Sequence, residues 1–209
     1  MVIFLVSFYF IVMYFYPQDC DILTNIDNAA MQITAGVAGN WSYNASVTYT
    51  CEVGYTLTTN QSMICSSNGS WHGMQPPVCE LVTCQPPTAP NNGSYVPQNA
   101  TYNFAAVIQF ICHQGFDRIG PNSSYCTASG QWSESPPVCQ IKDCGNLTDP
   151  THGQVVHTGG TSFGQTAYYN CSEGYILNGT ASRTCNELGN WTLASPTCDA
   201  ISKSSIIIF

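Results

Sequence analysis

The chain has 209 residues, of which 44% are hydrophobic and only 8% are charged, and its formal net charge is −8 at pH 7. Its four lysine and arginine residues are far apart in sequence: Arg118, Lys142, Arg183 and Lys203. Nucleic acids and heparin-like polyanions bind clustered cationic side chains, so this composition argues against both as partners.

The chain begins with an apolar run over residues 1–16 that contains no lysine or arginine. Its length suits the apolar core of a secretory signal peptide and falls short of a comfortable membrane span. We therefore predict a signal peptide or anchor over residues 1–18, with cleavage as the first choice. An uncleaved anchor or an incomplete gene model is the alternative, and only an uncleaved anchor would place the protein on a membrane.

Twelve cysteines form three quartets with nearly equal spacing, which indicates an internal repeat. Four cysteines per repeat, with none left over, favour disulfides, although the spacing alone leaves three connectivities open in each quartet. No two cysteines within a repeat are two to four residues apart, so a zinc site is disfavoured. The quartets are Cys20, Cys51, Cys65 and Cys79; Cys84, Cys112, Cys126 and Cys139; and Cys144, Cys171, Cys185 and Cys198.

The repeats predict three domains, at residues 20–79, 84–139 and 144–198, followed by a short tail at 199–209. Domains of this size bury too little apolar surface to be stable without cross-links. Disulfides persist in oxidising compartments, so we expect an extracellular or cell-surface protein. Linkers of four residues without glycine or proline, 80–83 and 140–143, predict closely spaced domains rather than freely flexible ones.

Each repeat shows the same strand pattern around its second cysteine, with apolar residues at every second position. A glycine and an aromatic residue follow, and a Gly-x-Trp sequence comes after the third cysteine. Aromatic residues at fixed places in each repeat are expected to fill a small core. These predicted core residues are Tyr49, Phe110, Tyr169, Trp71, Trp132 and Trp191.

Eleven Asn-x-Ser/Thr sequences could carry N-glycans, which would keep a surface with so few charges hydrated. Asn170 and Asn190 are the weakest candidates, because Cys171 and Trp191 are the middle residues of their sequons. The nine favoured sites are Asn40, Asn44, Asn60, Asn68, Asn92, Asn99, Asn122, Asn146 and Asn178.

The cysteines, the Gly-aromatic pair, the Gly-x-Trp and a proline before the last cysteine, in fixed order three times, resemble the sushi family. Its repeats are also called complement control protein modules or short consensus repeats. The resemblance implies an all-β protein, a tandem array of three small disulfide-stapled β-sandwich modules. It also implies that the first cysteine pairs with the third and the second with the fourth. The implied bonds are Cys20–Cys65, Cys51–Cys79, Cys84–Cys126, Cys112–Cys139, Cys144–Cys185 and Cys171–Cys198.

The first repeat departs from this pattern in its N-terminal half. Where the other repeats have Asn92-Gly93 and His152-Gly153, it has Asn28-Ala29, without a nearby proline. It also has about three additional residues before its second cysteine, and these include the aromatic residue Trp41.

Catalysis has little support in this sequence, which contains no nucleophile elbow, zinc-protease motif or phosphate-binding loop. We expect no enzyme activity, no metal and no cofactor. In the sushi family, partners are often bound by a protruding segment after the first strand, here 35–43, 97–104 and 157–164. These segments contain Trp41, Tyr102, Phe104 and Phe163, and we expect Phe104 and Tyr43 to pack inward.

These observations together predict an extracellular, non-enzymatic binding or adhesion protein that recognises another protein. A protein similar to complement regulators is one alternative, implied by the resemblance only. A structural spacer within a larger mosaic receptor is the other alternative.

Overall fold

The computed structural model describes residues 18–36, 39–59, 62–72 and 77–201. These residues form strands, turns and loops and contain no helix, which confirms the all-β class. The apolar segment 1–16, the sequon residue Asn60 and the cation Lys203 lie outside the described residues.

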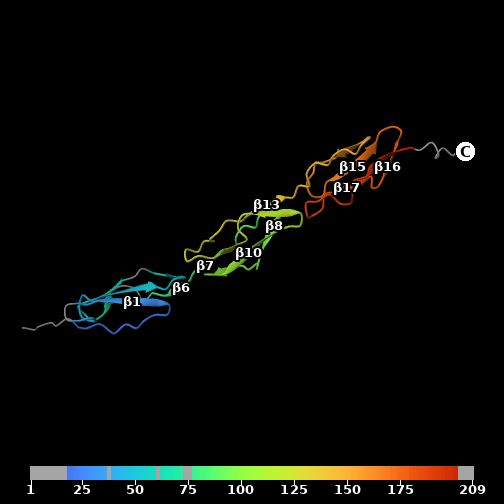
Figure 1. Ribbon diagram of the computed structural model, residues 1–209. Helices are drawn as coiled ribbons and strands as arrows, with labels where there is room; N and C mark the ends of the chain where they lie inside the picture. The colour runs from blue at the N-terminus through green and yellow to red at the C-terminus, as the bar shows by residue number, and fades with distance from the viewer. Residues whose placement is uncertain (1–17, 37–38, 60–61, 73–76, 202–209) are drawn as a thin grey trace, which may run out of the picture. The chain divides into compact units, whose positions relative to one another are not determined.

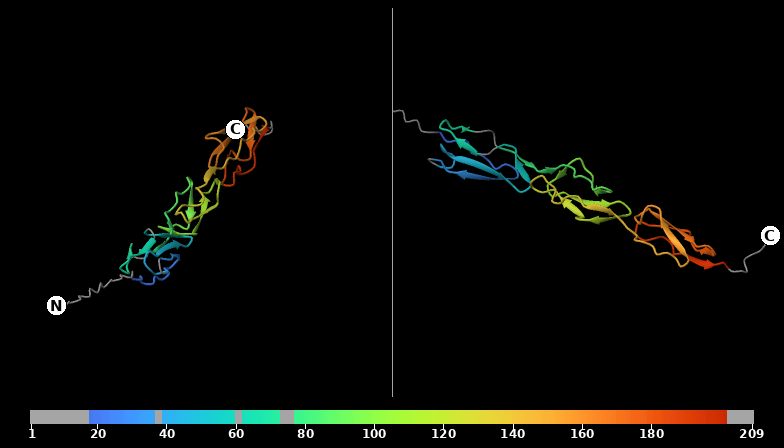
Figure 2. Two further views of the ribbon diagram at one scale, coloured as in Figure 1. Left: turned by 90° about the vertical axis from the view of Figure 1, so that its left-hand side faces the viewer. Right: turned by 90° about the horizontal axis from the view of Figure 1, so that it is seen from above.

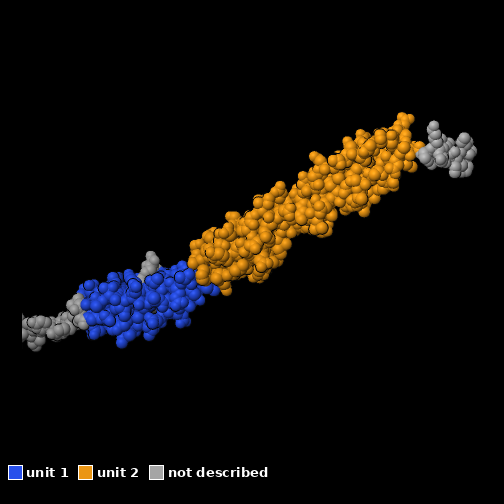
Figure 3. Space-filling view, viewed as in Figure 1, with its two compact units in different colours: residues 1–82 blue, residues 83–209 orange. Residues whose placement is uncertain are grey.

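The chain divides into two compact units, Met1–Val82 and Thr83–Phe209, which are coloured separately in Figure 3. Unit 1 contains the first repeat, called module 1 from here on. Unit 2 contains the second and third repeats, modules 2 and 3.

Module 1 is built around one four-stranded antiparallel sheet in the order β1-β2-β4-β5, with β3 and β6 paired in a second sheet. Figure 1 labels β1 and β6 of this module. Its strands are β1 Ala29–Thr34, β2 Ser46–Cys51, β3 Tyr55–Leu57, β4 Ser62–Cys65, β5 Trp71–His72 and β6 Cys79–Leu81.

Module 2 has a three-stranded sheet in the order β12-β10-β8 and two smaller sheets, β11-β13 and β7-β9. Its strands are β7 Thr83–Cys84, β8 Gly93–Val96, β9 Tyr102–Asn103, β10 Val107–Cys112, β11 Phe116–Ile119, β12 Ser123–Tyr125 and β13 Val138–Ile141.

Module 3 repeats this plan, with one sheet in the order β14-β15-β17 and a second made of β16 and β18. The perpendicular views of Figure 2 show strands that run along the length of each module in unit 2. The strands of module 3 are β14 Gly153–His157, β15 Thr166–Cys171, β16 Tyr175–Asn178, β17 Ser182–Thr184 and β18 Thr197–Ala200.

The core of each module lies on one face of its central strand. Along β10, Ile108 and Phe110 are buried, whereas Val107, Gln109 and Ile111 between and beside them are exposed. The central strands β2 and β15 alternate in the same way. Alternation with period two is what a half-buried strand requires, because successive side chains point to opposite faces of the sheet.

The first strand of module 1 has the same register as its counterparts, despite its divergent sequence. Ala29 lies opposite Cys51, as Gly93 lies opposite Cys112 and as Gly153 lies opposite Cys171. The additional residues of module 1 are therefore accommodated in the connection between β1 and β2.

At both ends of the described chain, regular structure extends slightly beyond the module boundaries predicted from sequence. Gln18, assigned above to the apolar N-terminal segment, forms a parallel bridge with Asn68 of module 1. Asp199 and Ala200, assigned above to the tail, are the last two residues of β18.

Candidate functional site

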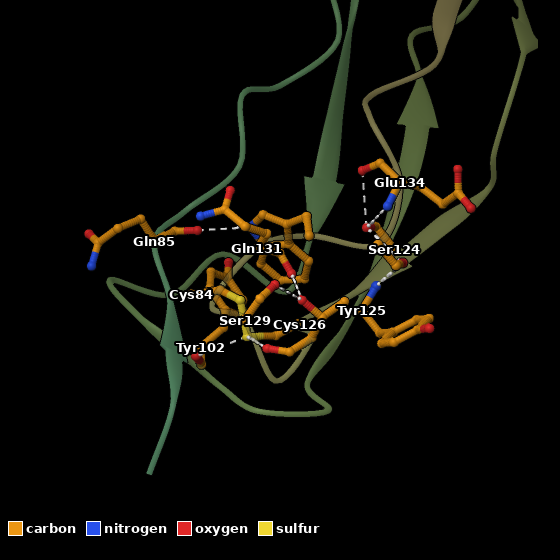
Figure 4. The surroundings of a disulfide bond; sticks show 12 residues. Cys84, Gln85, Tyr102, Ser124, Tyr125, Cys126, Ser129, Gln131 and Glu134 are labelled. Atoms are coloured by element: carbon orange, nitrogen blue, oxygen red, sulfur yellow. Dashed lines mark hydrogen bonds between the residues drawn. A yellow bond between two sulfur atoms is a disulfide. The ribbon is translucent and has the colours of Figure 1, made fainter. Parts of the chain in front are cut away.

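Each of the three modules contains two disulfide bonds, and none of the described cysteines is free. Each module has one bond from its first to its third cysteine and one from its second to its fourth, as the family resemblance implies. Figure 4 shows the Cys84–Cys126 bond with Tyr102 and Gln85 beside it. The bonds are Cys20–Cys65, Cys51–Cys79, Cys84–Cys126, Cys112–Cys139, Cys144–Cys185 and Cys171–Cys198.

The six aromatic residues expected in the cores fall into two groups. Tyr49, Phe110 and Tyr169 are buried. The three tryptophans are only half-buried. Each indole N–H donates to the backbone carbonyl of the residue after the first cysteine of its module. The indole donors and their acceptors are Trp71 to Asp21 at 2.9 Å, Trp132 to Gln85 at 2.8 Å and Trp191 to Gly145 at 2.8 Å.

Two aromatic residues of the candidate binding loops pack against these tryptophans. Trp41 makes an edge contact with Trp71, with ring centroids 6.1 Å apart. Tyr102 is buried and makes a similar contact with Trp132 at 5.1 Å. The Tyr102 hydroxyl also donates to the Pro97 carbonyl at 2.6 Å and accepts from the Asn99 amide at 2.8 Å. Tyr102 therefore stabilises its own loop.

The remaining loop aromatics differ in their environments. In unit 2, Phe163 of module 3 lies against Gly115 of module 2, so closely that a Cβ atom on Gly115 would overlap the phenyl ring. Phe104 is half-buried. Tyr43 is 41% exposed, so the expectation that it packs inward is wrong. Its neighbour Ala45 is buried in its place as the chain enters β2.

All ten sequon asparagines among the described residues are exposed. They include Asn170 and Asn190, which the sequence disfavoured, because both side chains point away from the core. Asn178 differs from the others in donating its side-chain amide to Asp199 at 2.7 Å.

The three described cations of unit 2 have different environments. Lys142 lies 3.5 Å from the Asp117 carboxylate. Arg183 donates to the Thr192 carbonyl at 2.8 Å and to the Ser195 hydroxyl at 2.8 Å. Arg118 makes only a long contact, 3.4 Å, with the Phe110 carbonyl. Arg118 is thus the cation whose donors are least used within the described residues.

The start of module 3 is held by Asp143. A hydrogen bond from the Thr161 side chain, and then one from the Gly145 backbone N–H at 3.1 Å, lower the pKa of the Asp143 carboxyl below its ordinary value. The backbone supports the same contact, since the Cys144 amide donates to the Thr161 carbonyl and Asp143 forms a bridge with Ser162.

In module 2, burial raises the pKa of the Tyr95 hydroxyl, and the neighbouring Tyr102 raises it further.

An open groove of about 550 Å³ lies beside Arg118 in module 2. Sequence reasoning missed it, although a signal was present: Arg118, six residues after the second cysteine, is aligned with Leu57 and Leu177 of the other modules. The residues that line the groove include Phe110, Ile111, Cys112, Phe116, Arg118 and Asn122.

Other classes of site find no support in the described part of the chain. Among those residues, no three His, Cys, Asp or Glu side chains come together where they could hold a metal ion. The same residues include no helix with the length and apolarity needed to span a membrane.

Comparison with known proteins agrees with the family resemblance seen in the sequence. The family model for the Sushi repeat (SCR repeat) matches residues 20–79, 84–139 and 144–198. The chain is 38% identical over 169 residues to the mouse sushi, von Willebrand factor type A, EGF and pentraxin domain-containing protein 1. It is 32% identical over 191 residues to human E-selectin and 30% identical over 197 residues to mouse P-selectin.

The matches cover most of this chain but a small part of each relative. They include 80% of the chain and 5% of the mouse multidomain protein. For human E-selectin the shares are 90% and 31%, and for mouse P-selectin they are 90% and 26%.

Proposed function

The chain belongs to the Sushi repeat (SCR repeat) family, and from this premise we propose that it is an extracellular, non-enzymatic adhesion-type protein that binds another protein. The observation that carries the proposal is the array of three disulfide-linked modules, with two bonds in each. Such modules are stable only in an oxidising compartment. Relatives in which the same modules form part of longer proteins, the selectins among them, support the proposal.

The surface of the chain also supports a binding function. The grooves of modules 2 and 3 are open to solvent. The exposed side chains of Val107 and Tyr125 belong to directly paired residues of β10 and β12. Exposed apolar side chains grouped on one face are typical of surfaces that contact another protein.

The experiment is a cell-binding assay with the secreted, fluorescently labelled full chain. We expect saturable binding that is abolished when cell-surface proteins are removed by protease. The same chain after reduction and alkylation is the matched control, since it keeps the composition and loses the fold. Binding that survives protease treatment and is lost after removal of cell-surface glycans would contradict a protein partner.

A structural spacer is the second candidate function, favoured by the junction within unit 2. There, β13 continues to Ile141, the Lys142 amide donates to the Gly115 carbonyl, and Phe163 packs on Gly115. Such contacts stiffen a connection, as a spacer requires. A chain that binds no cell surface in a saturable way would support the spacer over the adhesion protein. No contact in the described residues specifically favours a protein similar to complement regulators.

N-glycans form part of the proposal, because exposed sequon asparagines occur in every module and charged side chains are few. We expect several occupied sites per module when the chain is secreted from a glycosylating host. Enzymatic release of N-glycans in heavy-oxygen water, followed by peptide mass spectrometry, identifies each occupied asparagine. An unchanged mass after enzymatic release would refute this part of the proposal.

A further inference from the structure

The groove of module 2 is bordered by Arg118, at a position where modules 1 and 3 have leucine. In module 1 the aligned Leu57 packs against the core cluster of Val47, Tyr49 and Met63. In module 3 the aligned Leu177 is also half-buried. Arg118 is exposed instead, so its long side chain borders the space that a leucine covers in the other two modules.

The floor of the groove contains strand backbone. The Phe110 amide donates to the Asn122 carbonyl at 2.8 Å on the side of β12. Because backbone groups alternate along an antiparallel strand, the N–H and C=O of Cys112 point to the same side as those of Phe110. The ladder between β10 and β12 extends only from Val107 to Gln109, so it ends before Cys112 is reached.

Two apolar side chains of β10, Ile111 and Val107, lie on the outer face of the β12-β10-β8 sheet, with the exposed Gln109 between them. Ile111 lines the groove and is 46% exposed. Val107 lies directly opposite Tyr125, and these side chains are 56% and 53% exposed. The corresponding outward residues are Ser46, Thr48 and Thr50 in module 1 and Thr166, Tyr168 and Asn170 in module 3. Of these three central strands, only β10 has aliphatic residues on its outward face.

The charge at the groove is the opposite of the charge of the chain. No residue that lines the groove carries a carboxylate, whereas the whole chain has a formal net charge of −8. The guanidinium of Arg118 has five donors, and only its long contact with Phe110 uses one. A planar fork of unused N–H groups matches the two oxygens of a carboxylate.

We propose that this groove binds an extended segment of the protein partner that carries an aspartate or glutamate beside an aliphatic residue. The carboxylate pairs with Arg118, the aliphatic side chain packs on Ile111, and the segment's backbone bonds to Cys112. The proposal rests on the proposed function, since it assigns the surface by which this chain meets a protein.

Asn122 makes the site sensitive to glycosylation. Its side chain is exposed at the groove, and it is one of the nine favoured sequon residues. A bulky glycan on this asparagine would cover the groove. Glycosylation at Asn122 and occupation by a peptide segment are therefore mutually exclusive.

The test uses the full chain, prepared without N-glycans and with all six disulfides verified, as the target for a phage-displayed library of random heptapeptides. We expect the selected sequences to share an acidic residue next to an aliphatic one. A synthetic peptide of this type should bind at least about tenfold more tightly than the same peptide with its acid replaced by the neutral amide, because a charge-assisted hydrogen bond is lost. When this peptide is added, the NMR chemical shifts of the chain's backbone amides should change most at Ile111, Cys112 and Asn122.

Arg118→Leu is the decisive variant, because leucine is the residue at this position in both other modules and should fold there. It should lose the peptide, whereas Lys142→Gln, which removes a cation with a different environment in unit 2, should retain it. Glycosylated wild-type chain should bind more weakly than glycosylated Asn122→Gln.

Three results would overturn the assignment: no acidic consensus, equal binding by Arg118→Leu, or full competition by a sialylated oligosaccharide, which would identify a glycan carboxylate instead. If Arg118→Leu still binds cells in a protease-sensitive way, the groove is wrong and the adhesion proposal stands. If the wild-type chain binds no cells, the adhesion proposal itself fails.

Discussion

Individual residues at equivalent positions keep the same contacts in all three modules, even where the residue type changes. Asn28, Asn92 and His152 directly precede β1, β8 and β14 with φ between 57° and 61°, and each carbonyl accepts from the backbone amide of the residue after the second cysteine. The next position is glycine in modules 2 and 3 and Ala29 in module 1. In modules 2 and 3, neighbouring atoms leave too little space for a Cβ atom at this position.

Gly93→Ala is expected to destabilise module 2. An added Cβ would lie 2.7 Å from the Ile111 carbonyl oxygen and 2.9 Å from both Cys139 Sγ and Pro90 Cγ. Overpacking of this kind costs about 1–3 kcal/mol. Amide hydrogen exchange along β10 measures the loss. The matched control is Ala29→Gly at the same register in module 1, which should cost at most about 1 kcal/mol. Unchanged exchange in Gly93→Ala would contradict the steric argument.

Asp143 should titrate at lower pH than an ordinary aspartate, because the Thr161 side chain and the Gly145 N–H stabilise its charged form. A pKa that is lower in the folded state than in the unfolded state contributes stability above the unfolded value. This contribution disappears as the pH falls through the folded value. Carbon-13 NMR of the Asp143 carboxyl measures the titration. Thr161→Val should return the pKa toward its ordinary value, and an unaltered titration in that variant would contradict the assigned cause.

At the scale of elements, the central strand β10 and the first-to-third disulfide form one core in module 2. In module 2, Cys84 and Cys126 are fully buried in one cluster with Tyr102, Ile108 and Phe110. The second bond of the module is closer to solvent, since Cys112 is only half-buried. Removing the Cys84–Cys126 bond should therefore destabilise the module more than removing the Cys112–Cys139 bond.

Removing the Cys84–Cys126 bond by alanine substitution of both cysteines should unfold module 2 or leave it marginal. The bond closes a loop with a sequence separation of 42, which is worth about 4 kcal/mol in the chain-entropy model. Loss of two buried sulfur atoms adds a packing cost. The matched control removes Cys112–Cys139, with a separation of 27 and a similar entropic effect. Urea unfolding followed by hydrogen exchange in β10 compares them, and a greater loss in the control would refute the argument.

The sequence predicted the elements well because cysteine spacing and alternating apolar residues are local signals. The all-β class and the buried positions Tyr49, Phe110 and Tyr169 follow from them. The half-burial of Trp132 was missed, because it depends on a contact between segments far apart in the chain. Trp132 donates to Gln85, 47 residues away. The groove at Arg118 became evident only when the aligned leucines were compared with it in three dimensions.

At the scale of the whole molecule, the sparse cations have separate structural roles. All four lie after residue 117, so module 1 contains none. In unit 2, Lys142 is paired with Asp117 and Arg183 is bonded to Thr192 and Ser195. Arg118 contacts a single backbone carbonyl and has no carboxylate partner among the described residues, so most of its donors remain for an external anion. One arginine can bind one carboxylate, whereas a polyanion requires several cations that act together.

The chain is therefore expected not to bind heparin. A polyanion that approaches Arg118 meets the field of twelve acidic residues, and this repulsion acts beyond about 8 Å once salt is reduced below the physiological range. Chromatography on immobilised heparin at low ionic strength is the most stringent measurement, because screening is then weakest and any attraction is greatest. The chain should elute in the unbound fraction, and Arg118→Leu should behave identically.

Retention of the wild-type chain that is released by salt would show that its cations converge on one surface. If Arg118→Leu abolished that retention, the groove would have to be reassigned from a single carboxylate to a sulfated polymer.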